Sequence, residues 1–267
     1  MGYIQFRNAI IALIPARILQ FLKNQHYIKL LESYNIDQEP DLKIVKYLVA
    51  SGDTVLDIGA NVGVYTKFLS KFVGEEGLVY SIEPVTQTFN ILMTIKRALH
   101  LDNVEALNYA LSDNEGIIQM QIPHYLSGGE NYYQARVIKG TESKKNKFRH
   151  IEALATTLDK KFEDIANKIS FIKCDIEGHE LTCLQGGKEF LKKTNSAWLI
   201  EIGGNPDDEM TKAHEVFNIM SDKGYTTWWF DGSILHKRLS DERSVNYFFL
   251  LEHHVEKLMK DHPHIFI

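Results

Sequence analysis

The sequence predicts an α/β fold with a Rossmann-like, seven-stranded, mostly parallel sheet that has one antiparallel strand, helices on both faces and an N-terminal helical extension. Short apolar runs alternate with amphipathic stretches along the chain, which is the pattern of βαβ units on a parallel sheet. The first run, residues 54–58, leads into a glycine loop at 59–63 and then into a helical pattern from Val64. A strand, a tight loop and a helix N-terminus together form the place where an α/β sheet binds a nucleotide-like ligand.

Length and composition fit one such domain with an extension and an insertion. The chain has 267 residues, of which 44% are hydrophobic and 24% charged, as in ordinary globular proteins. Its formal net charge of -5 provides no general basic field, so we expect no nucleic-acid partner. The two cysteines, Cys174 and Cys183, lack metal-ligand spacing and favour a reduced, cytoplasmic location.

Residues 1–40 are predicted to form the helical extension. The stretch 3–23 is rich in Ile, Leu and Phe, contains basic residues and no acid, and is interrupted by Pro15. Its unbroken apolar run, 9–16, is too short to span a bilayer, and no convincing signal-peptide cleavage site follows. Two interpretations stay open: a pair of short helices packed over the sheet edge or against a homodimer partner, or a basic amphipathic segment that makes peripheral contact with an anionic membrane.

Residues 41–267 are predicted to form the main domain, which begins with a helix at 41–50. Apolar runs of strand length follow, separated by amphipathic stretches of helix length. We expect strands at 54–58, 78–82, 104–108, 170–174, 197–202, 226–230 and 247–251, and helices at 64–72, 86–99, 180–191 and 212–223.

The direction of the last strand follows from the link that precedes it. Residues 231–246 contain no helical pattern, whereas a parallel crossover needs a dozen or more residues that are usually helical. We therefore expect the seventh strand to run antiparallel in an otherwise parallel sheet.

An insertion at about 123–150 interrupts the alternation. Residues 117–122 read as a strand, and polar sequence with Gly128-Gly129 follows. Because ligands bind at the carboxyl ends of the strands, this insertion can reach over the site, and we interpret it as a lid that contacts the acceptor. A solvated surface loop is an equal alternative for 142–147 and a weaker one for 125–133.

Two acids lie where a nucleotide-like ligand would meet the sheet. Asp57 precedes a G-x-x-x-G loop, which differs from the G-x-G-x-x-G of dinucleotide-binding proteins. An acid in this loop suits a ligand with an ammonium group and disfavours a phosphate, and S-adenosylmethionine has the first and lacks the second. Glu83 ends the second strand about twenty residues later, where a carboxylate can accept hydrogen bonds from both ribose hydroxyls. The alternative is that both acids only cap strand ends.

A second polar cluster follows the fourth strand. Asp175, Glu177, His179 and Glu180 fall within six residues at the turn into the next helix. His179 or Asp175 could act as a general base, with Glu177 keeping the base competent. The same residue types could bind a divalent cation, or could cap the helix, and we commit to no metal site. The neighbouring Lys173 should pair with an acid, for which Glu201 is a candidate.

The motifs Asp57 to Gly63, Glu83-Pro84, Asn108 to Asp113, Ile172 to Glu180 and Leu184 to Gly187, with 199–202, together resemble the FkbM-type methyltransferases. The resemblance covers roughly 42–203 and implies a class I methyltransferase fold and S-adenosylmethionine as cofactor. It implies that the methionine end lies against Asp57, Gly59, Ala60, Asn61 and Gly63, the ribose against Glu83 and the adenine against Asn108 to Ala110. Related methyltransferases often have an aspartate at the adenine; this chain has Tyr109-Ala110, so a backbone or Asn108 contact must substitute.

The predicted function is therefore S-adenosylmethionine-dependent O-methylation of a hydroxyl on a small-molecule acceptor, such as a sugar, a polyketide or a lipid-linked metabolite. The alternative is a non-catalytic protein of the same fold that serves as an assembly subunit or a membrane-associated one. A nicotinamide-dependent oxidoreductase is disfavoured by the loop spacing and by Asp57. Trp228 and Trp229 are interpreted first as sheet core and rim, and second as a platform for a sugar face.

Overall fold

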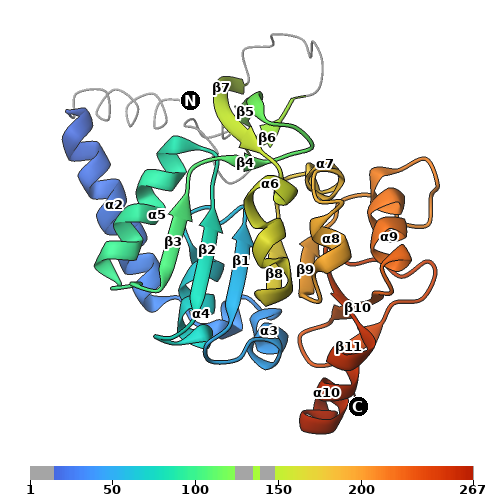
Figure 1. Cartoon of the computed structure of the whole chain (residues 1–267). Helices are drawn as coiled ribbons and strands as arrows, with labels where there is room; N and C mark the ends of the chain where they lie inside the picture. The colour runs from blue at the N-terminus through green and yellow to red at the C-terminus, as the bar shows by residue number, and fades with distance from the viewer. Residues whose placement is uncertain (1–14, 124–134, 139–147, 267) are drawn as a thin grey trace, which may run out of the picture.

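The computed structural model describes residues 15–123, 135–138 and 148–266, and it centres on one large sheet of eight strands. The strand order is β11-β10-β12-β9-β8-β1-β2-β3. Neighbours from β9 to β3 are parallel, whereas β12 is antiparallel to both β9 and β10 (Figure 1). The strands are β1 (Thr54–Ile58), β2 (Leu78–Ile82), β3 (Val104–Leu107), β8 (Ile169–Cys174), β9 (Ala197–Glu201), β10 (Thr226–Phe230), β11 (Leu235–Lys237) and β12 (Asn246–Leu250).

All seven predicted strands are present, and the antiparallel direction of the last one is confirmed. The predicted number is wrong, because β11 adds an eighth strand that also runs antiparallel to its neighbour β10. A tight turn joins the two: the Asp231 carboxylate accepts from the backbone N–H groups of Ser233 and Ile234, and Gly232 has a φ of 97°. Leu235 then anchors this short strand in the core.

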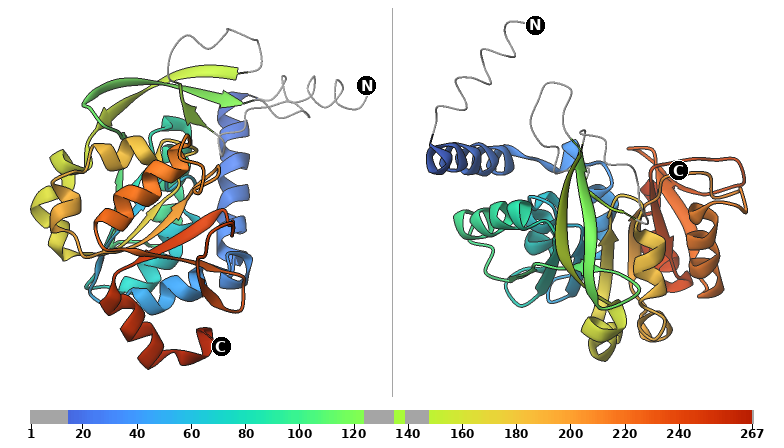
Figure 2. Two further views of the ribbon diagram at one scale, coloured as in Figure 1. Left: turned by 90° about the vertical axis from the view of Figure 1, so that its right-hand side faces the viewer. Right: turned by 90° about the horizontal axis from the view of Figure 1, so that it is seen from above.

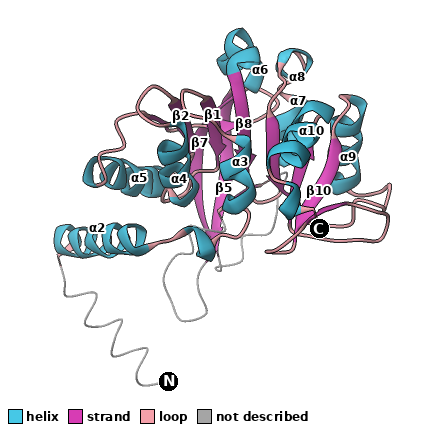
Figure 3. Cartoon of the chain, turned by 90° about the horizontal axis from the view of Figure 1, so that it is seen from below, coloured by secondary structure: helices cyan, strands magenta, loops and turns pink. Residues whose placement is uncertain are grey.

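Helices cover both faces of the large sheet (Figure 3). The alternation of side chains along β1 explains why: Val55 belongs to a core cluster with α3 and α4, whereas Leu56 belongs to a cluster with α6, α8 and α9. The helices are α3 (Leu42–Leu48), α4 (Val64–Val73), α5 (Thr86–Ala98), α6 (Leu158–Phe162), α7 (Glu180–Gln185), α8 (Phe190–Lys193), α9 (Lys212–Asp222) and α10 (Glu252–Asp261), with 3₁₀ turns at Ile36–Gln38, Glu163–Lys168 and Pro263–Ile265.

The single helix predicted for 180–191 is wrong in one respect, because it is divided into α7 and α8. The break falls at Gly186-Gly187. A Cβ at Gly186 would lie 1.9 Å from the carbonyl oxygen of Ser112, so the chain packs there backbone against backbone. This contact packs the end of α7 closely against the backbone of Ser112.

A second, smaller sheet lies across the carboxyl edge of the large one (Figures 1 and 2). Its order is β4-β7-β5-β6, and its strands are β4 (Ala110–Leu111), β5 (Gly116–Pro123), β6 (Arg136–Val137) and β7 (Phe148–Thr156). The strand predicted at 117–122 is confirmed as part of β5. The interpretations given to 125–133 and 142–147 fall outside the described residues.

The described part of the N-terminal extension contains the helix α2 (Ala16–Ser33), which lies beside α5 (Figure 2), and then the 3₁₀ turn at Ile36–Gln38. Leu31 is fully buried, whereas Ile18, Phe21 and Leu22 are at least half exposed. Lys67 of α4 holds the end of this segment by donating to the backbone oxygens of Leu31 and, at 2.8 Å, of Tyr34. Within the described ranges, no helix combines the length and apolarity that a bilayer crossing requires.

Candidate active site

The glycine loop is fixed by close backbone contacts at the carboxyl edge. The N–H groups of Gly59 and Ala60 both donate to the Ile82 oxygen at 2.9 Å, which ties the loop to the end of β2. Gly59 has a φ of 78°, and a Cβ there would lie 1.8 Å from the Asp175 oxygen. Gly63 has a φ of 98° at the N-cap of α4, where a Cβ would meet Leu92. Only glycine satisfies both positions.

Asp57 lies beneath this loop rather than in it. Its side chain is fully buried, accepts a 2.6 Å hydrogen bond from the Thr66 hydroxyl, and lies 4.0 Å from the Lys173 ammonium. Burial raises the pKa of Asp57, although Lys173 and Thr66 act in the opposite direction. Its Oδ1 atom has no hydrogen-bond partner among the described residues. Asp57 lines none of the cavities described below.

Glu83 faces a small cavity beside the loop. Its carboxylate accepts from the backbone N–H of Asn61 at 3.0 Å and from that of Val85 at 2.8 Å, and its exposed fraction is 6%. Burial raises the pKa of Glu83 to about 7, despite these two donors. Asn61 and Gly59 line the same cavity, and the Oδ1 atom of Asn61 is buried without a partner in the described chain. These acceptors remain available to a ligand that donates hydrogen bonds.

A more apolar cavity continues from Pro84. Tyr109, Ala110 and Ile176 line this slot, so two of the residues predicted to lie near an adenine are brought together there. Asn108 instead braces the chain: its amide donates at 2.8 Å to the backbone oxygen of Glu83. Asn108, the side chain predicted to contact the adenine in place of an aspartate, is therefore hydrogen-bonded to the segment that follows β2.

The polar residues that follow β8 do not share one site: each lies in a different environment. His179 is buried, lines the slot with Tyr109, and lies 3.0 Å from the Ser112 hydroxyl through Nε2. Glu180 accepts from the N–H groups of Ile176 and Gly178 and so fixes the turn. Glu177 is exposed, has a φ of 55° and lines the Glu83 cavity. Burial, together with the neighbouring carboxylates, raises the pKa of Glu177.

Asp175 lies on the other side of the turn, paired with Lys173. The ammonium donates to Asp175 at 3.1 Å and to the Gly59 oxygen at 3.2 Å. Burial acts to lower the pKa of Lys173, but Asp175 and Asp57 outweigh it and raise that pKa. The prediction that Lys173 pairs with an acid is confirmed, but its partners are Asp175 and Asp57 rather than the candidate Glu201. Lys173 and Asp175 are two residues apart at the end of β8, so their side chains leave the chain on the same side and can meet.

The largest of these cavities, with a volume of about 290 Å³, opens beside the loop and shares Gly59, Asn61 and Asp175 with the Glu83 cavity. Its volume is close to the lower end of the range for small-molecule sites, about 300–1,000 Å³. Glu201 faces it from the end of β9, where burial and the charges of Asp175 and Glu177 raise its pKa to about 7. Among the described residues, no hydrogen bond reaches the Glu201 carboxylate.

The lining of this cavity includes residues that were not predicted from the sequence, among them Leu30, Tyr34, Glu39 and Asn246. Tyr34 donates to Glu39 at 2.9 Å. Asn246 is the register partner of Glu201, because β12 runs antiparallel to β9 and begins where β9 ends. Its amide donates at 2.7 Å to Asp41, which ties the N-terminal segment to β12. The only sequence signal for Asn246 was the reversed direction of its strand.

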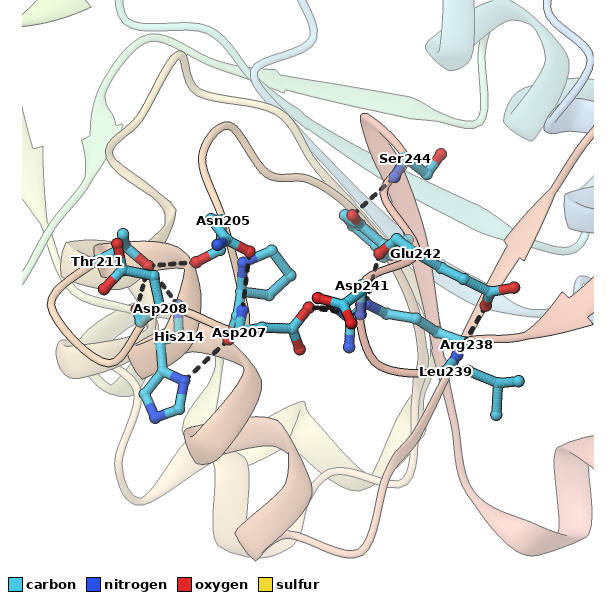
Figure 4. A network of polar contacts seen from close by, with 12 residues as sticks. Asn205, Asp207, Asp208, Thr211, His214, Arg238, Leu239, Asp241, Glu242 and Ser244 are labelled. Atoms are coloured by element: carbon cyan, nitrogen blue, oxygen red, sulfur yellow. Dashed lines mark hydrogen bonds and ion pairs between the residues drawn. The ribbon is translucent and has the colours of Figure 1, made fainter.

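A polar network holds the loops on either side of Glu201 and Asn246 (Figure 4). Asp207 pairs with Arg238 and accepts from the backbone of Asp241 at 3.0 Å. Arg238 donates in turn to the Glu242 carbonyl at 3.1 Å. These contacts join the loop that leaves β9 to the loop that enters β12.

The two tryptophans of β10 lie away from these cavities. Trp228 is buried and Trp229 stacks on His236, as expected for sheet core and rim. Both cysteines are free and buried, and Cys174 lines the largest of the three cavities. Within the described ranges, no three His, Cys, Asp or Glu side chains gather as a metal site would require.

Comparison with known proteins places the chain in a family. The model of the methyltransferase FkbM domain matches residues 57–227. No curated protein matches significantly. Similar solved structures include an S-adenosylmethionine-dependent methyltransferase from Aquifex aeolicus, at 18% identity, 85% coverage of this chain, 96% of that chain and a TM-score of 0.43. They also include methyltransferase FkbM from Methylobacillus flagellatus KT, at 14% identity, 85% and 59% coverage and a TM-score of 0.48. Since the matched model spans more than half of the chain and includes the glycine loop, Glu83 and the β8 edge, the chain belongs to the FkbM methyltransferase domain family.

Proposed function

We propose that the protein transfers a methyl group from S-adenosylmethionine to a hydroxyl of a small molecule. One observation carries the proposal: the cavity lined by Asp175 and Glu201 joins the Glu83 cavity at Gly59 and Asn61. Donor and acceptor would therefore meet at the carboxyl edge of the sheet, as ligands do in open α/β folds.

The described residues fit the donor. Glu83 has acceptor capacity for two ribose hydroxyls, Asn61 has an unpartnered oxygen, and Tyr109 with Ala110 offers a flat apolar surface for a base. When bound, S-adenosylmethionine supplies a methyl group activated by its sulfonium. The chain's own task is to align the acceptor oxygen with that methyl group and to take its proton.

We propose Glu201 as the group that takes the proton. Its carboxylate is half-buried, faces the larger cavity, and has a pKa of about 7, which suits a general base at neutral pH. Asp175, held by Lys173, would orient the acceptor. The geometry favours a donor-side role for His179, because it lines the slot with Tyr109 and lies beside Ser112. Its role as a base, and that of Glu177, stay predictions.

Calorimetric titration with S-adenosylmethionine tests the donor half of this proposal. We expect binding by the wild type, weaker binding by Glu83→Ala, and unchanged binding by Glu105→Ala, which removes an exposed acid from β3. Absence of binding by the wild type would refute the proposal. The acceptor half is tested by mass spectrometry, as the gain of one methyl group by a metabolite in cell extracts.

The N-terminal helix supports a second, separate proposal. Ile18, Phe21 and Leu22 expose an apolar face next to Arg17, which favours peripheral contact with an anionic membrane or a homodimer. Flotation with anionic vesicles and light scattering separate the two, and a protein that stays monomeric and unbound would refute both.

A further inference from the structure

The larger cavity is rich in negative charge, and the one cation that lines it within the described part of the chain is already engaged. Glu39, Asp175 and Glu201 contribute three carboxylates, against one ammonium from Lys173. Lys173 is held by Asp175, by the Gly59 oxygen and, at 4.0 Å, by Asp57. It therefore has little capacity to neutralise Glu39 or to bind an anionic acceptor.

The donor would offset only part of this charge. The methionine end of S-adenosylmethionine carries one ammonium and one carboxylate, so its sulfonium provides the single net positive charge. With Glu201 in the ionised form that can accept a proton, the lining carries two net negative charges, and one remains when the donor is bound. The three carboxylates are partly exposed, and a cavity lined by one sign of charge attracts the opposite sign, so a cation is the favoured further occupant.

The outer wall has the composition that recognises an ammonium group. Tyr34 and Glu39 lie beside each other, joined by a hydrogen bond of 2.9 Å, and both line the cavity. Burial, followed by the effect of Glu39, raises the pKa of Tyr34 to about 12, so its ring remains a neutral phenol. A carboxylate next to an aromatic ring binds a cation by charge and through the face of the ring.

This wall is fixed in place and lies outside the part of the chain matched by the family. Lys67 donates to the Tyr34 backbone at 2.8 Å, and Asn246 ties Asp41 to β12. Both Tyr34 and Glu39 precede residue 57, where the family match begins. The selectivity that they provide is thus a property of this chain rather than of the matched domain.

We propose that the acceptor is a small alcohol carrying an ammonium group, such as an amino sugar, whose ammonium binds Glu39 and the ring of Tyr34 while its hydroxyl faces Glu201. The inference rests on the proposed function. In the reaction, the methyl carbon–sulfur bond breaks as the methyl carbon–oxygen bond forms. The electron pair stays on sulfur, and the hydroxyl proton passes to Glu201. The protonated amine has no lone pair and is not methylated.

The test uses the full chain saturated with S-adenosylhomocysteine, and three sugars of similar size and different charge. Glucosamine, glucose and glucuronate are titrated in separate ligand-observed NMR experiments. We expect glucosamine to bind at least tenfold more tightly than glucose, the size of one charge-assisted contact. We expect glucuronate to bind more weakly than glucose.

Variants locate the effect. Glu39→Gln keeps the shape of the side chain and should reduce the preference for glucosamine to about threefold or less, as expected when a charge-assisted contact becomes a neutral one. Glu32→Gln removes an exposed acid from the same segment and should leave the preference unchanged. Unchanged affinity for S-adenosylhomocysteine in both variants shows that each is folded.

Three outcomes overturn the inference: equal binding of glucose and glucosamine, tighter binding of glucuronate, or no binding of any of the three sugars. A preference that survives in Glu39→Gln overturns the assignment to Glu39. Failure of the wild type to bind S-adenosylhomocysteine contradicts the proposed function instead, so the two failures are distinguishable.

Discussion

Protonation of Glu83 should control the affinity for S-adenosylmethionine near neutral pH. Burial raises the pKa of this carboxyl to about 7 in the ligand-free protein. Only the ionised form has free acceptors for both ribose hydroxyls, because each carboxylate oxygen already accepts from one backbone N–H. Binding therefore requires loss of a proton, and affinity falls as the pH falls through 7.

The magnitude follows from the fraction of Glu83 that is ionised. With a pKa of about 7, that fraction is roughly 0.9 at pH 8 and 0.1 at pH 6, so the apparent Kd should rise about tenfold between them. At pH 7, binding should release about half a proton. Calorimetry in buffers of different ionisation enthalpy measures both quantities.

Glu83→Gln provides the matched control. The amide does not titrate, so any pH dependence left in this variant belongs to the ligand or to other groups and can be subtracted. The variant should also bind about 10- to 100-fold more weakly at pH 8, since it replaces a charge-assisted hydrogen bond of about 1.5–3 kcal/mol. A Kd equally dependent on pH in the wild type and in Glu83→Gln would refute the reasoning.

Four further outcomes are expected. Glu201→Gln should lower kcat by about 10²- to 10⁴-fold without changing the Kd for the donor. Glu209→Gln, at an exposed position, should change neither quantity. If the Glu201→Gln enzyme stays fully active, Glu201 is not the base. His179→Ala should raise the Kd for the donor and leave kcat within about threefold of the wild-type value. Loss of a general base lowers kcat by much more than this. A large fall in kcat with an unchanged Kd would therefore identify His179 as the base. Lys173→Met should cost about 3–5 kcal/mol in denaturant unfolding, because Asp57 loses its counter-charge in the core, and a cost below 1 kcal/mol contradicts that ion pair. The ligand-free protein should lose thermal stability as the pH rises from about 4.5 to 7, because folded Glu83 keeps a proton that the unfolded chain has already released. Glu83→Gln, which does not titrate, is the control. A rise in the Tm of the wild type relative to this variant across the same pH window would contradict the raised pKa of Glu83.

The donor side of the site could be predicted from the sequence because its signals are local. Gly59 and Gly63 mark backbone conformations that other residues rarely adopt, and Glu83 follows them at a set interval along the next strand. The positions of the seven predicted strands follow from the alternation of apolar runs along the chain. The polar residues of the 175–180 turn were also found, but their distribution over three cavities depends on side-chain directions that no spacing reveals.

The acceptor side could not be predicted, because it is made by contacts between distant parts of the chain. Asp41 and Asn246 are 205 residues apart, and nothing near either residue indicates the other. Tyr34 and Glu39 lie in a segment without a strong apolar period. The strand β11 was missed for another reason: it has three residues, too few to show a clear alternation. The break at Gly186-Gly187, in contrast, had a local signal, since paired glycines disfavour a helix interior.

The bond between Asp41 and Asn246 also has a consequence for biosynthesis. The glycine loop, Glu83 and the β8 edge are all translated by residue 180, whereas β12 begins only at residue 246. Chains fold from the N-terminus as they emerge from the ribosome. The nascent protein can thus assemble its donor pocket well before the opposite wall is locked, because that last step awaits the synthesis of β12. The emergence of this late strand, rather than collapse of the central strands, completes the enclosure in which the two substrates would meet.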